Sequence, residues 1–126
     1  MYAAPPKCNL VVLRSPDIHR AAEFYLSMGL LIGLESHGNG PEHYACCVDG
    51  FVFEIYPLSA GQEPTTSVRI GFDVDDVDGL VEGLEGDGAE VIRRPADSPW
   101  GRRAVVKDFD GHVVELLTPT GRDAKG

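Results

Sequence analysis

The feature of this sequence that most constrains its fold is a duplicated motif. Residues 49–55 read DGFVFEI and residues 110–116 read DGHVVEL, so both have the form D-G-x-V-x-E followed by an apolar residue. The two copies lie 61 residues apart, with identities at the Asp, Gly, Val and Glu positions. Four identities at one offset indicate an internal duplication. Any fold for this chain must therefore accommodate two copies of one unit.

Each copy of the motif ends a longer segment with the same predicted order of elements: strand, helix and three strands. The helices are indicated by apolar residues at helical spacing, and the strands by alternation or short apolar runs. Ser15 is the expected N-cap of the first helix, with Pro16 in the first helical position, and Asp75-Asp76 are expected to cap the second. The predicted strands span residues 10–13, 30–36, 43–48 and 51–57 in the first unit, and 68–74, 89–93, 103–107 and 112–117 in the second.

These patterns predict an α+β fold in which two βαβββ modules form curved mixed sheets around a cavity, with the helices on the outer face. We expect a single domain over residues 1–126, with module one at about 8–60 and module two at about 67–119. Because successive strand residues point to opposite faces, Leu10, Glu54, Tyr56 and Arg69 are expected on the cavity face. Glu115 is expected there too, as the counterpart of Glu54.

Asp49-Gly50 is a strong signal for a two-residue hairpin turn. Such a turn pairs Cys47 with Val52 and, further along, His43 with Tyr56. Cross-strand partners share a face, so His43 is expected to face the cavity beside Glu54.

The composition excludes several classes of function. The formal net charge is −9, with 20 acidic against 11 basic residues, which opposes binding to nucleic acid or to an anionic membrane. No apolar run is long enough for a membrane span or a signal peptide, so a cytoplasmic location is expected. Cys8, Cys46 and Cys47 form no disulfide or metal pattern and are predicted to be small buried hydrophobic residues in a reducing compartment.

Several segments resemble the vicinal oxygen chelate superfamily. They are Leu10-Val11-Val12-Leu13, Ser15-Pro16-Asp17, Phe24-Tyr25, Gly29-Leu30, Asp73-Val74-Asp75-Asp76-Val77-Asp78, and the stretch from Asp108 to Glu115. The superfamily includes glyoxalase I, bleomycin-resistance proteins, extradiol dioxygenases and fosfomycin-resistance enzymes. The resemblance covers roughly residues 8–119 and is more specific for the fold than for any one activity.

In metal-dependent members, a residue on the first strand and a residue on the last strand of each module bind a divalent ion. The resemblance maps these positions onto Leu10, Glu54, Arg69 and Glu115. Leu10 offers no donor atom and Arg69 is a permanent cation, so the complete metal site is absent and no cofactor is expected. If an ion binds nevertheless, its expected ligands are Glu54, Glu115 and His43.

Three functions follow as hypotheses. The first is a protein of the bleomycin-resistance type that binds a small molecule in a pocket between the modules, without a complete metal site and with ligand contacts from Arg69, His43, Tyr56, Trp100 and Leu10. The resemblance implies a homodimer, sometimes with modules exchanged between chains. The second is a lyase or isomerase resembling glyoxalase I, in which Arg69 would stabilise an oxyanion and Glu54 or Glu115 would act as base. The third is a non-catalytic interaction domain with a collapsed cavity.

Two possibilities remain open for Arg69: a salt bridge to the cavity carboxylates, or binding of a ligand carboxylate or phosphate. Trp100 is expected either to roof the pocket or to pack over a sheet edge. His112 is expected to be a turn residue, and His19 and His37 are assigned no chemistry.

Overall fold

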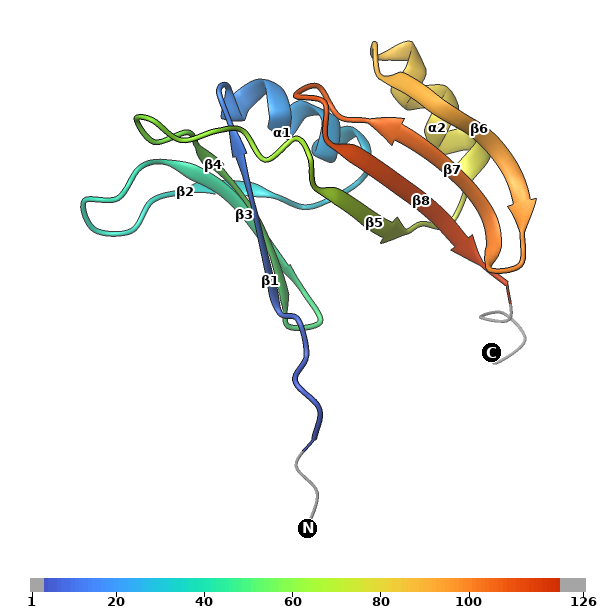
Figure 1. Ribbon diagram of the computed structural model, residues 1–126, viewed down its shortest axis with the longest axis horizontal. Coiled ribbons are helices and arrows are strands. Elements are labelled where there is room, and N and C mark those ends of the chain that lie inside the picture. The colour runs from blue at the N-terminus through green and yellow to red at the C-terminus, as the bar shows by residue number, and fades with distance from the viewer. Residues whose placement is uncertain (1–3, 121–126) are drawn as a thin grey trace.

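The computed structural model describes residues 4–120, which form two modules with the same order of elements (Figure 1). The first module consists of β1 (Leu10–Ser15), α1 (Ile18–Ser27), β2 (Gly33–Glu35), β3 (His43–Val48) and β4 (Phe51–Pro57). The second consists of β5 (Arg69–Asp73), α2 (Val77–Gly86), β6 (Glu90–Ser98), β7 (Gly101–Lys107) and β8 (Val113–Pro119).

Each module builds one mixed four-stranded sheet. The strand orders are β1-β4-β3-β2 and β5-β8-β7-β6, which are equivalent arrangements. The first strand of each module runs parallel to the last, and the remaining neighbours are antiparallel. The predicted α+β fold with two βαβββ modules is therefore confirmed, and within residues 4–120 the sheets do not close into a barrel.

The start of α1 differs from the prediction. Asp17, not Ser15, is the N-cap, and its Oδ1 accepts a hydrogen bond from the backbone N–H of Arg20 at 3.2 Å. Ser15 instead ends β1, opposite Pro57, and its Oγ accepts from the Asp17 N–H at 3.0 Å. The physical reason is that a residue before proline favours extended backbone, so Pro16 extends the strand by holding Ser15 out of the helix. In the second module the cap falls on Asp76, as predicted.

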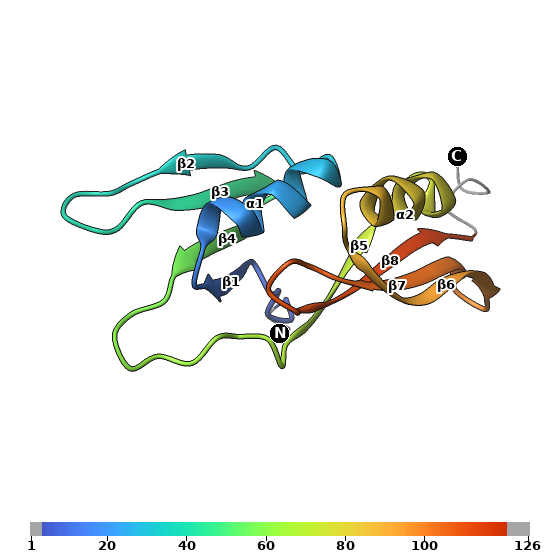
Figure 2. The same ribbon diagram turned by 90° about the horizontal axis from the view of Figure 1, so that it is seen from above.

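Both helices lie on the same side of the two sheets, which stand next to each other (Figures 1 and 2). Between them an aromatic cluster joins the modules. The Tyr25 ring lies 4.9 Å from that of Phe53 and 6.1 Å from that of Phe72, and Phe24 meets Phe109 edge-on at 5.6 Å. Since these rings come from α1, β4, β5 and the β7–β8 connection, the two modules share one apolar core.

A buried polar network reinforces this junction. The Tyr25 hydroxyl donates to Asp108 Oδ2 at 2.6 Å, and His112 Nδ1 lies 2.7 Å from the same oxygen. In the linker between β4 and β5, residues 58–68, Thr65 Oγ1 lies 2.7 Å from His112 Nε2 and accepts a hydrogen bond from the backbone N–H of Arg14 at 3.0 Å. The network therefore connects α1, the β7–β8 connection, the linker and β1.

His112 thus has a larger role than the turn position predicted for it. Its side chain is 1% exposed, and both ring nitrogens have partners. The role could not be deduced from local pattern because Asp108 is four residues away and Thr65 lies in another segment.

The cysteine prediction is wrong for two of the three residues. Cys8 and Cys47 are exposed and only Cys46 is partly buried, although all three are free thiols. Cys46 packs against the core, whereas Cys47 pairs with Val52 on the opposite face of the sheet. Alternation along β3 therefore exposes one of the two adjacent thiols.

Replacing Asp108 by Asn is expected to lower the free energy of unfolding by about 2–4 kcal/mol, because it breaks a buried charged network. Burial alone would raise the pKa of Asp108, but hydrogen bonds from His112 and Tyr25 outweigh it and lower the pKa. A lowered folded-state pKa means that the stabilisation is present above the unfolded value of about 3.9 and is lost as the pH falls through the folded value. Urea unfolding at neutral and acidic pH measures both effects.

The matched control is Asp110→Asn. Burial and the neighbouring Asp108 raise the pKa of Asp110, and its Oδ2 is buried without a hydrogen-bond partner among the described residues. Ionised Asp110 therefore opposes folding at neutral pH, and the Asn variant should be neutral or more stable by up to about 1 kcal/mol. Equal destabilisation by the two substitutions would contradict the role given to Asp108.

Candidate functional site

The predicted site residues of the first module lie on the sheet face opposite α1. The register pairs Ala45 with Glu54 and Cys47 with Val52, as the Asp49-Gly50 hairpin predicted. The His43 ring stacks on Tyr56 with centroids 4.1 Å apart and planes 9° apart. His43, Glu54 and Tyr56 therefore share this open face.

The contacts of Glu54 are local to its own module. Its Oε2 lies 3.8 Å from His43 Nε2, and its side chain is 17% exposed. Leu10, at the start of the edge strand β1, is half-exposed at 49% and aligns with Val52 rather than with Glu54. Hence the first-module half of the family's metal positions consists of one carboxylate beside a histidine and one apolar side chain.

In the second module, Glu115 is held between two arginines. Arg69 Nε donates to Oε2 at 2.6 Å and Arg103 Nε donates to Oε1 at 2.7 Å. The strand register explains these contacts, because Glu115 is paired with Gly71 on β5 and with Val105 on β7. Arg69 precedes Gly71 by two residues and Arg103 precedes Val105 by two residues, so both arginines lie on the same face as Glu115. Of the two interpretations open for Arg69, the structure contains the salt bridge.

The pKa of Glu115 reflects this arrangement. Partial burial would raise it, but hydrogen bonds and charges from Arg103 and Arg69 lower it below the ordinary glutamate value. Both carboxylate oxygens are already engaged by cations, and Leu10 supplies no donor. The four positions that bind metal in relatives therefore do not fit a divalent ion in this chain.

The partner role of Arg103 was not predicted. The sequence does indicate that Arg103 lies on the predicted strand that comes directly before the strand of Glu115. Pairing across the five-residue connection 108–112 could not be derived, because no short turn fixes the register as Asp49-Gly50 does in the first module.

The open face of the second sheet forms a pocket of about 610 Å³. Its lining residues all come from the second module: Arg69, Gly71, Phe72, Asp73, Trp100, Arg103, Glu115 and Leu117. The lining carries two arginines and two acidic residues, so it is formally neutral. The predicted ligand contacts Arg69 and Trp100 lie here, whereas His43, Tyr56 and Leu10 belong to the first module.

Trp100 is 66% exposed and is held at the pocket by a tight β6–β7 turn. Its backbone N–H bonds to Ser98 Oγ at 3.3 Å, and its carbonyl accepts from Thr120 at 3.0 Å. Gly101 has a φ of 139°, and a Cβ there would lie 2.1 Å from the Thr118 carbonyl oxygen, so only glycine fits. The turn therefore presents the indole on a constrained backbone.

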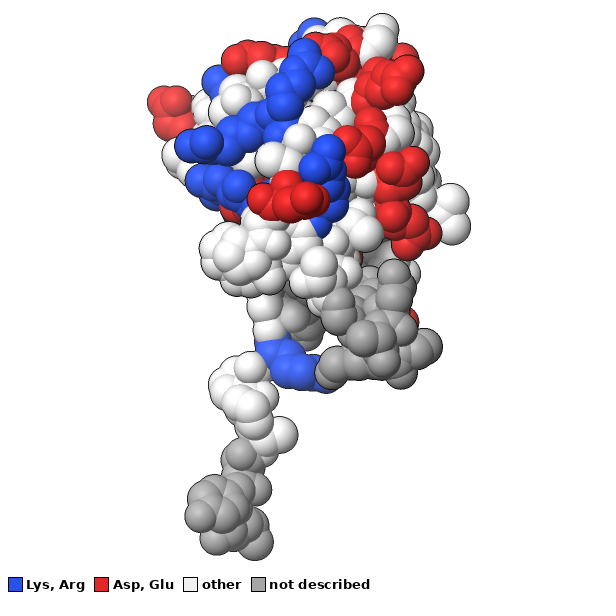
Figure 3. Space-filling view, turned by 90° about the vertical axis from the view of Figure 1, so that its right-hand side faces the viewer, with Lys and Arg blue, Asp and Glu red and all other residues white. Residues whose placement is uncertain are grey.

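Two arginines of the second module outside the pocket, Arg94 and Arg102, form ion pairs. On the end of the molecule formed by the second module, basic and acidic side chains lie next to each other (Figure 3). Arg102 contacts both Asp78, at 2.9 Å, and Asp97, at 3.2 Å, and Arg94 pairs with Glu85. In this view the Lys and Arg side chains form a diagonal row on one side of the face, and most of the Asp and Glu side chains lie on the other side (Figure 3).

Comparison with known proteins defines the class of this fold. The chain resembles TnmS3, an antibiotic binding protein from Streptomyces sp. CB03234, with a TM-score of 0.72 and 24% identity over 94% of this chain and 100% of that one. It also resembles a glyoxalase/bleomycin resistance protein/dioxygenase family enzyme from Burkholderia phytofirmans PsJN, with a TM-score of 0.70 and 19% identity over 88% and 97% of the two chains. At these identities the likeness shows a common fold.

Residues 7–116 match the sequence profile of the Glyoxalase/Bleomycin resistance protein/Dioxygenase superfamily, and the chain belongs to that superfamily. A sequence relative is an uncharacterised protein of Mycolicibacterium smegmatis, 26% identical over 114 residues, which are 90% of this chain and 95% of that one. Within residues 4–120, neither helix has the length and apolar character needed to cross a bilayer.

Removing the guanidinium groups of Arg69 and Arg103 should raise the pKa of Glu115 towards its ordinary value, since both arginines stabilise the ionised form. Carbon-detected NMR of the glutamate carboxyl groups, with Glu115→Gln for assignment, measures the shift in the Arg69→Gln/Arg103→Gln variant. Arg94→Gln, which removes an exposed arginine paired with Glu85, should leave the Glu115 pKa unchanged. An unshifted Glu115 in the double variant would contradict the ion-pair geometry.

Proposed function

We propose that this protein binds a small organic molecule in the second-module pocket and does so without the metal used by enzymes of the superfamily. The observation that carries the proposal is the engagement of both Glu115 oxygens by Arg69 and Arg103 in a pocket that Trp100 also lines. Arg69, at one of the positions that bind metal in relatives, and Arg103 neutralise Glu115, and the exposed Trp100 lines the same pocket.

The lining supports a particular ligand class. Trp100 offers a large flat face for stacking, and Phe72 and Leu117 add apolar surface. The balanced charges favour an uncharged or zwitterionic aromatic compound, because such a ligand leaves the Arg69–Glu115–Arg103 cluster intact. An antibiotic-like polycycle has this character, and the similar protein TnmS3 is described as antibiotic binding.

A glyoxalase-I-like lyase is the weaker candidate. That chemistry needs a Lewis acid beside a mobile proton acceptor. Here Glu115 is held by two guanidinium groups. Glu54 lies in the first module, where its ion-pair contact among the described residues is with His43. Glu115, Glu54 and Arg69 are therefore proposed as binding and positioning groups, not as a catalytic set.

We also propose a homodimer in which the first-module open face of one chain covers the second-module pocket of its partner. The pocket is lined by one module only, and Leu10 and Trp100 present exposed apolar surface on these faces. Such a dimer would bring His43, Tyr56 and Leu10 towards the ligand. The three free thiols favour a reducing compartment such as the cytoplasm.

Ligand binding is expected to quench the fluorescence of Trp100, which is the single tryptophan of the chain. Titration with planar aromatic antibiotics, polycyclic quinones among them, measures this directly. Arg103→Gln should weaken binding about tenfold, equivalent to about 1.4 kcal/mol, by releasing Glu115 into the pocket. Trp100→Phe, followed by calorimetry, should weaken binding by a similar factor through the smaller stacking surface.

Arg94→Gln is the matched control, because it removes an exposed arginine of the same module outside the pocket lining. Turnover of a hemithioacetal by the metal-supplemented protein would overturn the proposal. Binding that is equally weakened by the Arg94 and Arg103 variants would show that the pocket is not the site.

Light scattering should give twice the mass of one chain for the unmodified protein. Leu10→Lys is expected to shift the protein towards the monomer, because it places a charge on a face that the partner would bury. Leu31→Lys is the control, since Leu31 is 90% exposed and lies between α1 and β2. A monomeric mass for the unmodified protein at high concentration would refute the dimer.

A further inference from the structure

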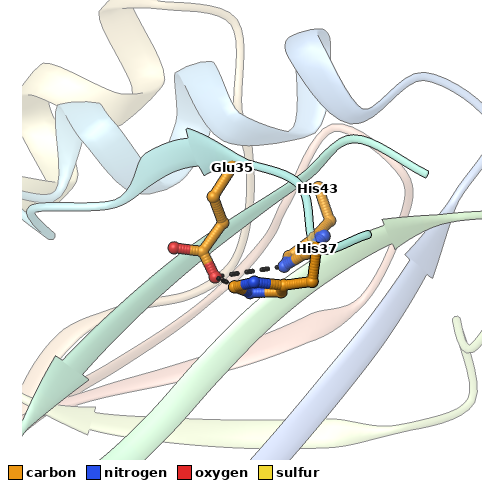
Figure 4. A group of neighbouring side chains, drawn as sticks. All are labelled: Glu35, His37 and His43. Carbon is orange, nitrogen blue, oxygen red and sulfur yellow. Dashed lines mark hydrogen bonds and ion pairs between the residues drawn. The ribbon is translucent and has the colours of Figure 1, made fainter. Parts of the chain in front are cut away.

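A second group of ligand-type side chains lies apart from the pocket, on the first module. Glu35, His37 and His43 approach one another so that one ligand atom from each lies within 4.8 Å of the others (Figure 4). Glu35 Oε1 is 3.0 Å from His37 Nε2 and 3.1 Å from His43 Nε2. None of the three occupies a position that binds metal in the superfamily.

The fold accounts for this meeting. Glu35 and His43 are directly opposed in the antiparallel β2–β3 pair, so their side chains share a face. The loop that joins the strands turns at Gly38, with a φ of 56°, and the Gly40 N–H bonds to the His37 carbonyl at 2.9 Å. This turn returns His37 over the strand pair, where its ring lies 5.3 Å from that of His43.

The hydrogen bonds of His43 prepare its Nε2 as a ligand. His43 Nδ1 lies 3.1 Å from the Pro41 carbonyl, which can only accept, so Nδ1 carries a proton. A second ring nitrogen tied to a carbonyl in this way is the usual support of a metal-binding histidine. The ring is also fixed by stacking on Tyr56 and is 1% exposed.

In the neutral ring, Nε2 then presents a lone pair to two carboxylates, Glu35 Oε1 at 3.1 Å and Glu54 Oε2 at 3.8 Å. A buried lone pair facing two anionic oxygens is unfavourable unless a cation stands between them. Either a second ring proton or a metal ion can fill that place. His37 Nε2 approaches the same Glu35 oxygen and could serve as a third metal ligand. A proton shared between His43 and Glu35 would not need this third group.

We propose that Glu35, His37 and His43 form a site for a late first-row divalent metal ion such as Zn²⁺ or Ni²⁺. Bonds of about 2.0–2.2 Å place tetrahedral ligand atoms about 3.3–3.6 Å apart, so the histidine nitrogens, at 3.0 and 3.1 Å from Glu35 Oε1, need to move by only a few tenths of an ångström. Two imidazoles with one carboxylate suit zinc, nickel, cobalt or copper, whereas Mg²⁺ and Ca²⁺ prefer oxygen ligands throughout. Three protein ligands leave a position open to water or to Glu54.

The exposure of Glu35 and His37 makes the proposed metal site accessible from solvent. The side chains of Glu35 and His37 are 42% and 72% exposed, so an ion can enter from solvent and these two ligands can adjust around it. His43 is the fixed member at the base. Sequence reasoning assigned no chemistry to His37 because a histidine in a glycine-bearing loop has no periodicity to place it.

The test uses tag-free, chelator-treated protein carrying Cys8→Ser and Cys47→Ser, so that exposed thiols do not bind the metal. Calorimetric titration with Zn²⁺ should give one ion per chain, and Co²⁺ should give the intense visible bands of a four-coordinate nitrogen–oxygen site. Mg²⁺ and Ca²⁺ should not compete. Glu35→Gln and His37→Ala should each weaken zinc binding by about tenfold to a hundredfold.

His19→Ala is the matched control, because His19 is an exposed histidine of the same module that lies outside the cluster and bonds to the Tyr44 hydroxyl. It should bind zinc like the parent protein. Zinc binding is measured without any aromatic ligand, so its outcome does not depend on the proposed pocket. Absence of zinc binding, or zinc binding unaffected by the Glu35 and His37 substitutions, would overturn the proposal.

Discussion

The buried carboxylate of Asp108 is the interaction on which the arrangement of this molecule depends. It accepts from the Tyr25 hydroxyl, contacts His112 Nδ1, and receives the backbone N–H groups of residues 110–112 on its other oxygen. His112 and Thr65 extend the network to β1. A buried charge is tolerated only when such partners are all present, so the network favours one relative placement of α1, the linker and the β7–β8 connection. The network therefore also fixes how the open faces of the two sheets are placed relative to each other.

The two modules share a topology and differ in chemistry. Glu54 and Glu115 occupy equivalent places in the duplicated motif, but Glu54 stands beside a buried histidine, and Glu115 is bound by two guanidinium groups. The duplicated backbone therefore supports an imidazole–carboxylate cluster on one sheet and an arginine–carboxylate cluster on the other. The charge around each glutamate is set by side chains on the adjacent strands and not by the repeated glutamate itself.

The arginines also explain how a member of this superfamily can keep an ionised Glu115 in the pocket without a metal ion beside it. A close cation stabilises an ionised carboxylate despite partial burial, which is the electrostatic task that a metal ion would otherwise perform. Unlike a metal ion, guanidinium groups supply no open coordination position and little Lewis acidity. This difference in chemistry is the reason why we propose binding, and not catalysis, for the pocket.

The sequence by itself determined the duplicated βαβββ plan, the open face for the strands that carry Glu54, Arg69 and Glu115, and the register across Asp49-Gly50 that sets His43 beside Tyr56. These features are local, because they rest on periodicity and on a two-residue turn. Only the tertiary structure decided that Arg103 pairs with Glu115, that Glu35 and His37 meet His43, and that His112 is buried against Asp108. Those contacts depend on strand registers across longer connections and on the packing of one module against the other, which no local pattern specifies.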